Sequence, residues 1–369
     1  MNPIAFAVGK VVLPPLGWAL CVSKGHGRVA WTESLDKVRT IETVEFAHSF
    51  LGDDLSLEEQ VKKVYAADPF RALWLAEGVG LHYGRMAIQQ RDAPQKLLAE
   101  GPALKLPHKI LLMAHAGMGM AIARHFLDEI KKNGGASRIR DAVEQIVRLI
   151  KGNSRQGYLG IAFEPCGMAT RFFYGRDMFL SVVNEVSRLE PTYVPHLWHG
   201  AGRGLYFVNF IPHFGEPWPS FRLVDQESSD SVSRSNLMAG LSSGIMMVNM
   251  QAPQVMEAIV RSRVAKFSAE DADAFSNGVI CSTVMRNDTT PDEHYMLAFA
   301  DYTPHPDVEP LWNRLIKEPV KAALKVYYPV LRDRSSLDVV CSYQPVAEIV
   351  QRLQAGSKSQ IGAIPAPGA

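Results

Sequence analysis

Two glutamates stand in matching sequence contexts and could carry acid–base chemistry. Glu77 and Glu164 each follow an apolar run, and each begins a Glu-x-x-Gly segment that ends at Gly80 or Gly167. If both side chains face one groove, burial would raise the pKa of at least one carboxyl group. Such a group could protonate an alkene or a carbonyl, or abstract a proton. The alternative is that each glutamate forms a helix cap or an ion pair within its own segment.

Histidines accompany the two glutamate segments. His115 begins a segment that contains Gly117-x-Gly119, and His199 begins one that contains Gly202-x-Gly204. We expect His115 or His199 to assist or orient a catalytic glutamate. Glu-x-x-His, the metal-binding pattern of helical bundles, is absent near both of them, so no metal ligand is predicted. The alternative is that these histidines are structural.

Arginines and large apolar side chains near these segments are candidates for binding a substrate. Arg124 and Arg203 could hold a carboxylate or a phosphate group, and the alternative is that each pairs with an acidic residue of the protein. A long apolar ligand would need a cavity with methionine and aromatic side chains in its wall. The candidates for that wall are Met118, Met168, Phe172 and Met246.

Other chemistries find little support. Asp53 and Asp54 resemble the acidic magnesium motif of class I terpene cyclases, but they directly precede a capping box, Ser56 to Glu59, where acidic residues favour the helix dipole. A matching second metal motif is missing, so a cyclase that uses Mg²⁺ is kept only as an alternative, and otherwise no cofactor is predicted. No Gly-x-Ser-x-Gly elbow, P-loop or complete dinucleotide fingerprint occurs.

Helix signals dominate the elements that must position these residues. Besides the capping box, Asp68 precedes Pro69 as a helix start, and the run 139–150 places apolar residues on one face of a helix. Strand signals are few, and the clearest is the short β-rich run 337–343. The sequence therefore predicts an all-α fold with few or no strands, built from internally repeated pairs of helices as in a solenoid or a bundle.

The glycines carry the evidence for the repeat. The two glutamate segments and the two histidine segments recur in the same order at nearly the same spacing, and a weaker third copy follows near Gly240 and Gly278. Glycine costs about 1 kcal/mol relative to alanine inside a helix, so another backbone or a ligand should approach closely at these positions. We expect an N-terminal extension (1–52), a helical body (53–355) with units near 68–150, 151–235 and 236–300, and a flexible tail (356–369).

Charge and cysteine content exclude several classes of protein. The 369 residues include 39 Lys and Arg against 38 Asp and Glu, a net charge of +1, which gives no excess for binding nucleic acid. The four cysteines form no C-x-x-C pair and are expected to be buried, as in a reducing, cytoplasmic compartment. The apolar run 4–22 is interrupted by Lys10 and by two prolines, so neither a cleaved signal peptide nor a membrane span is expected, and peripheral contact with a membrane is left open.

The glycine-rich segments resemble those of an uncharacterised bacterial family found beside enediyne polyketide synthases. The resemblance spans residues 65–285 in short blocks: 77–84, 115–123, 200–208 and 236–248. Arg203 lies inside its Gly-x-Gly pair, whereas the family pattern has arginine just after the second glycine. The resemblance implies secondary metabolism, that is, natural-product biosynthesis, without a defined mechanism.

These observations lead to one main functional prediction and two alternatives. The main one is an accessory enzyme of natural-product biosynthesis that acts on an apolar polyene, polyketide or isoprenoid-like intermediate, with Glu77 or Glu164 as acid or base. The first alternative is a non-catalytic helical scaffold that binds a synthase or a carrier protein. The second is a noncanonical terpene cyclase. Whether the chain is an enzyme at all is left open by the sequence.

Overall fold

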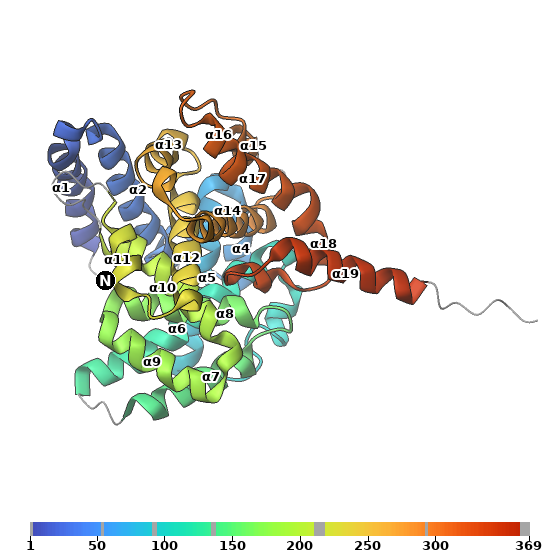
Figure 1. The fold of residues 1–369 in the computed structure, drawn as a ribbon. Coiled ribbons are helices and arrows are strands. Elements are labelled where there is room, and N and C mark those ends of the chain that lie inside the picture. Colours follow the sequence, from blue (N-terminus) through green and yellow to red (C-terminus); the bar gives the residue numbers. More distant parts are fainter. Residues whose placement is uncertain are drawn as a thin grey trace, which may run out of the picture.

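The chain folds as an assembly of α-helices in a computed structural model that describes residues 3–52, 55–90, 94–133, 138–209, 218–291 and 294–361 (Figure 1). No strand occurs within these ranges, so the predicted all-α class is confirmed. The first half contains α1 (Pro3–Cys21), α2 (Gly27–Glu45), α3 (Ala47–Leu51), α4 (Leu57–Ala66), α5 (Pro69–Gln90), α6 (His108–Asn133), α7 (Ile139–Asn153), α8 (Leu159–Ala169) and α9 (Arg176–Leu189). The second half contains α10 (Val194–Val208), α11 (Ser220–Glu227), α12 (Ser231–Asn249), α13 (Pro253–Ser262), α14 (Ala269–Thr289), α15 (His294–Ala300), α16 (Glu309–Trp312), α17 (Glu318–Ala322), α18 (Tyr328–Asp333) and α19 (Val346–Ile361).

Six helices form the centre of the molecule: α5, α6, α8, α10, α12 and α14. Each packs against the next in this order, and α14 also packs against α5 and α6 (Figure 1). Their middle turns are buried almost without exception, which places the core of the protein between them. Residues from all six helices can therefore meet in one interior.

Glycines stand where these central helices cross. A Cβ atom on Gly117 of α6 would lie 1.9 Å from the backbone oxygen of Glu77 on α5, and one on Gly200 of α10 would lie 1.8 Å from that of Glu164 on α8. Gly240 of α12 approaches the backbone oxygen of His199 equally closely, at 1.8 Å. The recurring glycines thus allow tight packing of helix backbones. The internal repeat itself stays a prediction.

The N-terminal segment is part of the same body. Helix α1 packs against α2, and α2 packs in turn against α5, α12 and α13. Figure 1 shows this pair of helices standing beside the central group. Segment 1–52, predicted as an extension, therefore contributes α2 to the wall of the interior. At the other end α19 runs to residue 361, and residues 362–369 of the predicted tail lie outside the described ranges.

Two predicted helix starts are confirmed, and one predicted strand is wrong. The capping box of Ser56 and Glu59 is present at the start of α4, and the Asp68 carboxylate accepts a hydrogen bond from the backbone N–H of Phe70 as α5 begins. The predicted strand 337–343 is wrong, because 337–341 form a 3₁₀-helix. The described residues contain no strand with which it could pair its backbone groups.

Candidate active site

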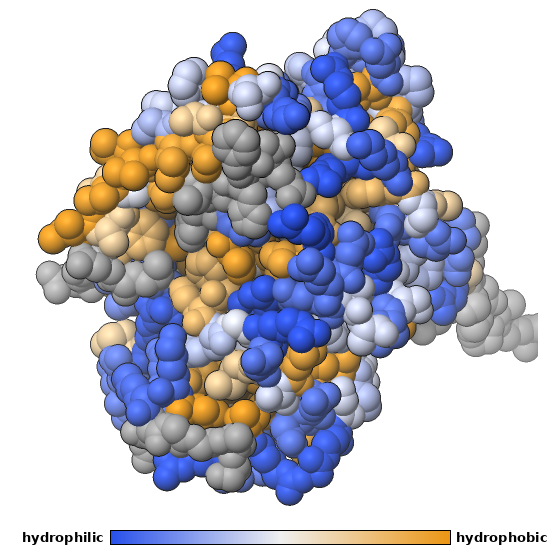
Figure 2. Space-filling view, turned by 60° about the vertical axis from the view of Figure 1, so that its left-hand side comes forward, coloured by the Kyte–Doolittle hydropathy of each residue, from blue (hydrophilic) through white to orange (hydrophobic). Residues whose placement is uncertain are grey.

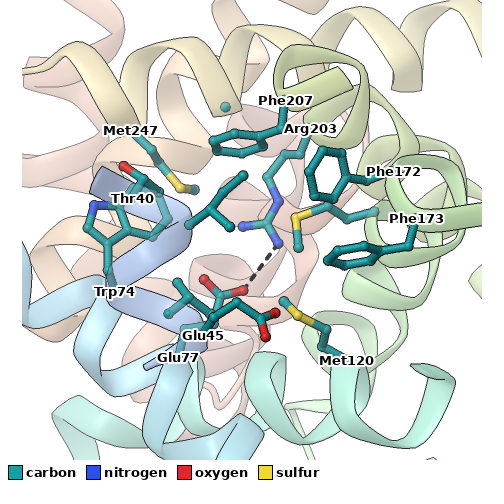
Figure 3. Close-up of a pocket in the computed structure, with 14 residues that line it drawn as sticks. Thr40, Glu45, Trp74, Glu77, Met120, Phe172, Phe173, Arg203, Phe207 and Met247 are labelled. Atoms are coloured by element: carbon teal, nitrogen blue, oxygen red, sulfur yellow. Dashed lines mark ion pairs between the residues drawn. The ribbon is translucent and has the colours of Figure 1, made fainter. Parts of the chain in front are cut away.

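Arg203 lies at the centre of a buried ion cluster. It extends from α10, and its side chain is only 2% exposed. Its Nη2 donates to Glu164 Oε2 on α8 at 2.7 Å and lies 3.7 Å from Glu77 Oε1 on α5. Figure 3 shows the guanidinium group reaching from α10 toward Glu77. The two glutamates singled out in the sequence are therefore brought together by one arginine, and they come from different helices.

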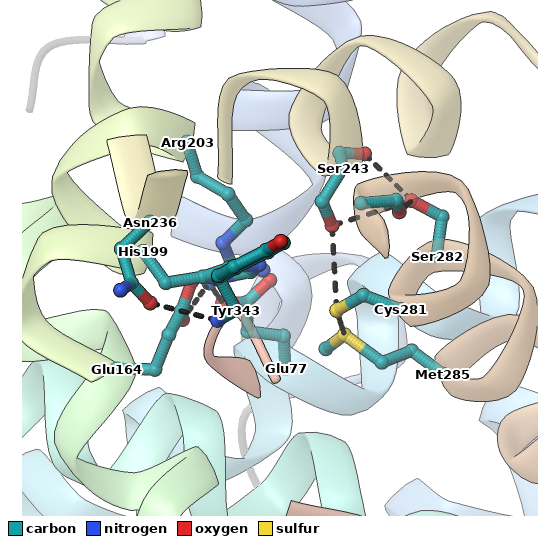
Figure 4. A network of polar contacts seen from close by, with 11 residues as sticks. Glu77, Glu164, His199, Arg203, Asn236, Ser243, Cys281, Ser282, Met285 and Tyr343 are labelled. Atoms are coloured by element: carbon teal, nitrogen blue, oxygen red, sulfur yellow. Dashed lines mark hydrogen bonds and ion pairs between the residues drawn. The ribbon is translucent and has the colours of Figure 1, made fainter. Parts of the chain in front are cut away.

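His199 is the second cation of this cluster. It lies one helical turn before Arg203, and its Nδ1 is 3.2 Å from Glu164 Oε1, so Glu164 uses one oxygen for each of the two residues (Figure 4). Burial lowers the pKa of the imidazole, but the opposing effects of Cys281 and Glu164 are larger, so the pKa is raised to about 9. His199 is therefore protonated at neutral pH. Arg203 is likewise a cation, because Glu164 and Glu77 outweigh the cost of burying it and raise its pKa.

Cys281 on α14 is a further member of this cluster and interacts with His199. Its thiol is fully buried and accepts a hydrogen bond from Ser243 Oγ on α12 at 3.6 Å (Figure 4). Burial raises the pKa of the thiol, but a hydrogen bond with Cys341 and the charge of His199 lower it. The thiol itself donates to Met285 Sδ at 3.6 Å, so Cys281 has hydrogen-bond partners on α12 and on its own helix.

Glu77 differs from Glu164 in its environment. It is 2% exposed, and its Oε1 makes no hydrogen bond within the described residues, although it lies within ion-pair distance of Arg203. Burial raises the pKa of its carboxyl group, Arg203 lowers it, and Glu164 and Glu45 raise it again, to about 7. Glu77 can therefore exchange a proton near neutral pH, which is the property that a general acid or base requires.

A mostly apolar cavity opens directly onto Glu77 and Arg203. It is narrow, with about 40 Å³ available to the centres of water-sized atoms. The wall combines α2, α5, α6, α8, α10 and α12 with the segment that follows α8 (Figure 3). Its lining residues are Thr40, Ile41, Val44, Glu45, Trp74, Glu77, Met120, Met168, Phe172, Phe173, Arg203, Phe207, Gly244 and Met247.

The cavity contains only part of the predicted lining. Met168 and Phe172 face it, as expected for a wall of methionine and aromatic side chains. Met118 and Met246 do not line it and are packed in the core instead. They were predicted as part of the cavity wall, and the sequence did not reveal which side of each helix faces the cavity.

A second, wider space lies beside the cavity and is called the outer chamber below. It offers about 560 Å³ on the same measure, and it shares Thr40 and Trp74 with the cavity. Its remaining walls carry Lys10, Asp36, Arg39, Glu42, Thr43, Phe50, Asp68, Phe70, Arg71, Val248 and Gln251. The outer chamber is polar where the cavity is apolar. Thr40 and Trp74 therefore form the boundary between a polar space and an apolar one.

Arg124 takes part in a different ion cluster, at the rim of the cavity. It pairs with Glu45, which also accepts a hydrogen bond from Arg85 at 3.1 Å, and its guanidinium lies 4.3 Å from the ring centre of Phe173. Burial raises the pKa of Glu45, and the two arginines outweigh it, so the pKa is lowered. Arg124 thus pairs within the protein, which is the alternative that the sequence left open. It reaches the cavity only through Glu45 and Phe173.

His115 lies apart from the ion cluster. Its Nδ1 donates to the backbone oxygen of Leu111 at 2.7 Å, and its Nε2 accepts from the backbone N–H of Arg155 at 3.1 Å. Its ring stacks on Tyr158, with 4.6 Å between the ring centres. Burial lowers its pKa to about 4, so the ring is neutral. The structure gives His115 no contact with Glu77 or Glu164, and it matches the structural alternative.

Sequence reasoning missed Glu45, Cys281 and the role of Ser243. One signal could have found two of them. Ser243 and Cys281 each follow a glycine of a helix crossing by three residues, as Arg203 follows Gly200. Residues three apart lie on the same helix face, so these three side chains point toward the same interior. Glu45 carries no comparable signal, because α2 has no glycine in the repeated pattern.

A metal site finds no support among the described residues. No group of three or more His, Cys, Asp or Glu side chains is arranged there to hold a metal ion. Asp53 and Asp54, which carried the magnesium alternative, lie outside the described ranges.

The raised pKa of Glu77 predicts a pH dependence of stability. The folded state binds its proton up to about pH 7, whereas the unfolded chain releases it near pH 4.5. The contribution of Glu77 to the free energy of unfolding therefore falls by about 3 kcal/mol in total as the pH rises from 4.5 to 7. Glu77→Gln should remove that contribution, so its stability relative to the wild type should increase between pH 5 and pH 8. Denaturant unfolding of both proteins at the two pH values measures this difference, and equal slopes would contradict it.

No known family model, curated protein or solved structure matches this chain. Any function assigned to it therefore rests on the cavity and on the ion cluster at its inner end.

Proposed function

We propose that this protein is an enzyme that acts on an apolar intermediate of natural-product biosynthesis, a polyene, a polyketide or an isoprenoid-like chain, with Glu77 as the proton-transferring group. The observation that carries the proposal is the Glu77 carboxyl group. It stands in an apolar cavity with one oxygen free of hydrogen bonds and a pKa of about 7. A buried carboxyl group without a hydrogen-bond partner is costly, so its retention needs a reason beyond stability.

The chemistry follows from the protonation state. Protonated Glu77 donates its proton to an alkene carbon or a carbonyl oxygen of the bound substrate, which becomes a cation, and Glu77 becomes a carboxylate. Arg203, at 3.7 Å, stabilises that carboxylate. The carboxylate then takes a proton from a neighbouring carbon of the substrate, which restores Glu77 and leaves an isomer. This sequence balances without a cofactor.

Glu164 and His199 are positioning residues in this scheme. Neither lines the cavity. Glu164 accepts from both Arg203 and His199, so it fixes the guanidinium group beside Glu77. Burying the Glu164 carboxylate together with the Arg203 guanidinium group costs less free energy than burying either charge alone.

The shape of the cavity indicates the class of substrate. Its wall has three phenylalanines, a tryptophan and three methionines, which suit an unsaturated hydrocarbon better than a polar metabolite, and at about 40 Å³ the cavity must widen to hold a long one. The scaffold alternative predicts an open groove with no deep cavity. A narrow cavity that ends on an ionisable group favours the enzyme.

The test is a comparison of the metabolites that accumulate in producing cells. We expect cells with Glu77→Gln to accumulate the same apolar intermediate as cells that lack the gene, since the amide cannot transfer the proton. Glu144→Gln, on the exposed face of α7, is the matched control and should behave as the wild type. Extraction followed by mass spectrometry measures the outcome. Normal product formation by Glu77→Gln would overturn the proposal.

A further inference from the structure

Helix α1 exposes an apolar stripe along its whole length. Ile4, Val8, Val11, Pro15 and Trp18 follow one another at intervals of three or four residues, and Val22, directly after α1, continues the series. All are exposed, Ile4 and Val11 to 70% and 73%. Figure 2 shows the stripe as a continuous hydrophobic ridge. An apolar stripe this long on the surface of a protein usually marks a binding face.

The opposite face of α1 fastens the helix to the body. Phe6 is buried against Phe46, with 5.6 Å between the ring centres, and Lys10 Nζ forms an ion pair with Glu42 on α2 at 2.7 Å. The exposed stripe is therefore held in place along α2 instead of being free to turn inward. By length and composition alone α1 could also cross a membrane, as could α6, which is mostly buried in the core. The contacts with α2 favour a helix that lies along a surface.

Charge and aromatic side chains at one end of the stripe indicate what covers it. Residues 3–32 contain no Asp or Glu, whereas Lys24 and Arg28 are exposed beside the turn between α1 and α2. The Trp18 ring lies against Gly27, next to these cations, and Trp31 is exposed one turn further along α2. Tryptophan and basic residues at the border of an apolar helix face are typical of helices in the interface of a bilayer with anionic lipids.

We propose that the exposed stripe of α1 docks the protein on the surface of an anionic phospholipid membrane, with Lys24 and Arg28 at the headgroups. The outer chamber supports this placement. Lys10 of α1 lines it, and Phe50 at its wall is 49% exposed. The outer chamber shares Thr40 and Trp74 with the cavity, so docking places the side of the protein next to the Glu77 cavity near the bilayer. That the membrane delivers the substrate rests on the proposed function.

Vesicle flotation of the full chain tests the docking. We expect binding to phosphatidylglycerol vesicles that weakens with added salt, and much weaker binding to phosphatidylcholine vesicles. Val12 lies one turn after Val8, beside the stripe, and the two are 50% and 54% exposed. Val8→Ser with Val12→Ser should lower the partition coefficient by about tenfold or more, because each change removes apolar groups that the bilayer would bury. Val232→Ser with Val326→Ser is the matched control, since these valines are as exposed (55% and 45%) but lie on other helices. Lys24→Glu with Arg28→Glu should abolish only the preference for phosphatidylglycerol.

Three results would overturn the docking. One is a wild-type chain that does not float with either vesicle. Another is a wild-type dimer that Val8→Ser with Val12→Ser converts to a monomer, which would make a second copy the occupant of the stripe. The third is resistance of the membrane-bound chain to alkaline carbonate extraction, which would mean that α1 spans the bilayer. Glu77→Gln should float as the wild type does, so a failure of the catalytic proposal leaves the docking result intact.

Discussion

Replacing Arg203 by methionine is expected to destabilise the protein by about 3–5 kcal/mol, because it leaves Glu164 buried without its nearest cation. Methionine is similar to arginine in volume but shorter, so the space left by the guanidinium group contributes a small part of the loss. The loss should also raise the pKa of Glu77 further, since Arg203 is the group that lowers it. Denaturant unfolding at pH 7 measures the change in stability.

Two further variants identify the cause of that loss. Arg148→Met removes an arginine from an exposed position of α7 and should change stability by less than about 0.5 kcal/mol. Adding Glu164→Gln to Arg203→Met removes the uncompensated carboxylate, and part of the stability should return. If the double variant is as unstable as the sum of the two single variants, the ion pair is not the reason for the loss.

The pairing of Glu77 with Glu164 could be predicted, but its geometry could not. Equivalent glycines after both residues indicated that the two turns pack in the same way, and the structure shows both carboxylates within reach of Arg203. Which carboxylate lines the cavity depends on α2, whose Glu45 and Thr40 complete the wall. The sequence of α2 has no periodic feature that points to this role, because its contacts with α5 and α12 come from distant parts of the chain.

The all-α class followed from local signals, since caps and apolar periodicity act within one helix. The segment 337–343 shows the limit of such signals. Its valines favour a strand, but its carboxylate at Asp338 accepts a hydrogen bond from the backbone of Gly160 at 2.9 Å, and its buried residues pack against α8 and α14. These tertiary contacts decide its structure and lie outside any local window.

A single methyl group on Gly200 is expected to disrupt the centre of the molecule. A Cβ atom there would lie 1.8 Å from the backbone oxygen of Glu164 and 2.9 Å from the backbone nitrogen of Met168. Because both atoms belong to the backbone of α8, no rotamer change relieves the clash, and α8 must move away from α10. We expect Gly200→Ala to lose about 3 kcal/mol of stability or more, despite the higher helix propensity of alanine.

Gly9→Ala is the control variant that separates the effect of tight helix packing from the effect of helix propensity. Its Cβ would meet Leu13 and Val38 side chains at 3.6 and 3.7 Å, which are ordinary contacts, so this variant should gain up to about 1 kcal/mol of stability.

The same movement of α8 that destabilises Gly200→Ala would also lengthen the contacts of Glu164 with His199 and Arg203, because Glu164 is the residue that the methyl group displaces. Thermal and denaturant unfolding measure the first effect, and the pH dependence of stability reports the second through Glu77. Equal stability changes for the two glycine variants would show that the helices cross less tightly than the structure indicates, and the ion cluster would then owe its geometry to side-chain packing alone.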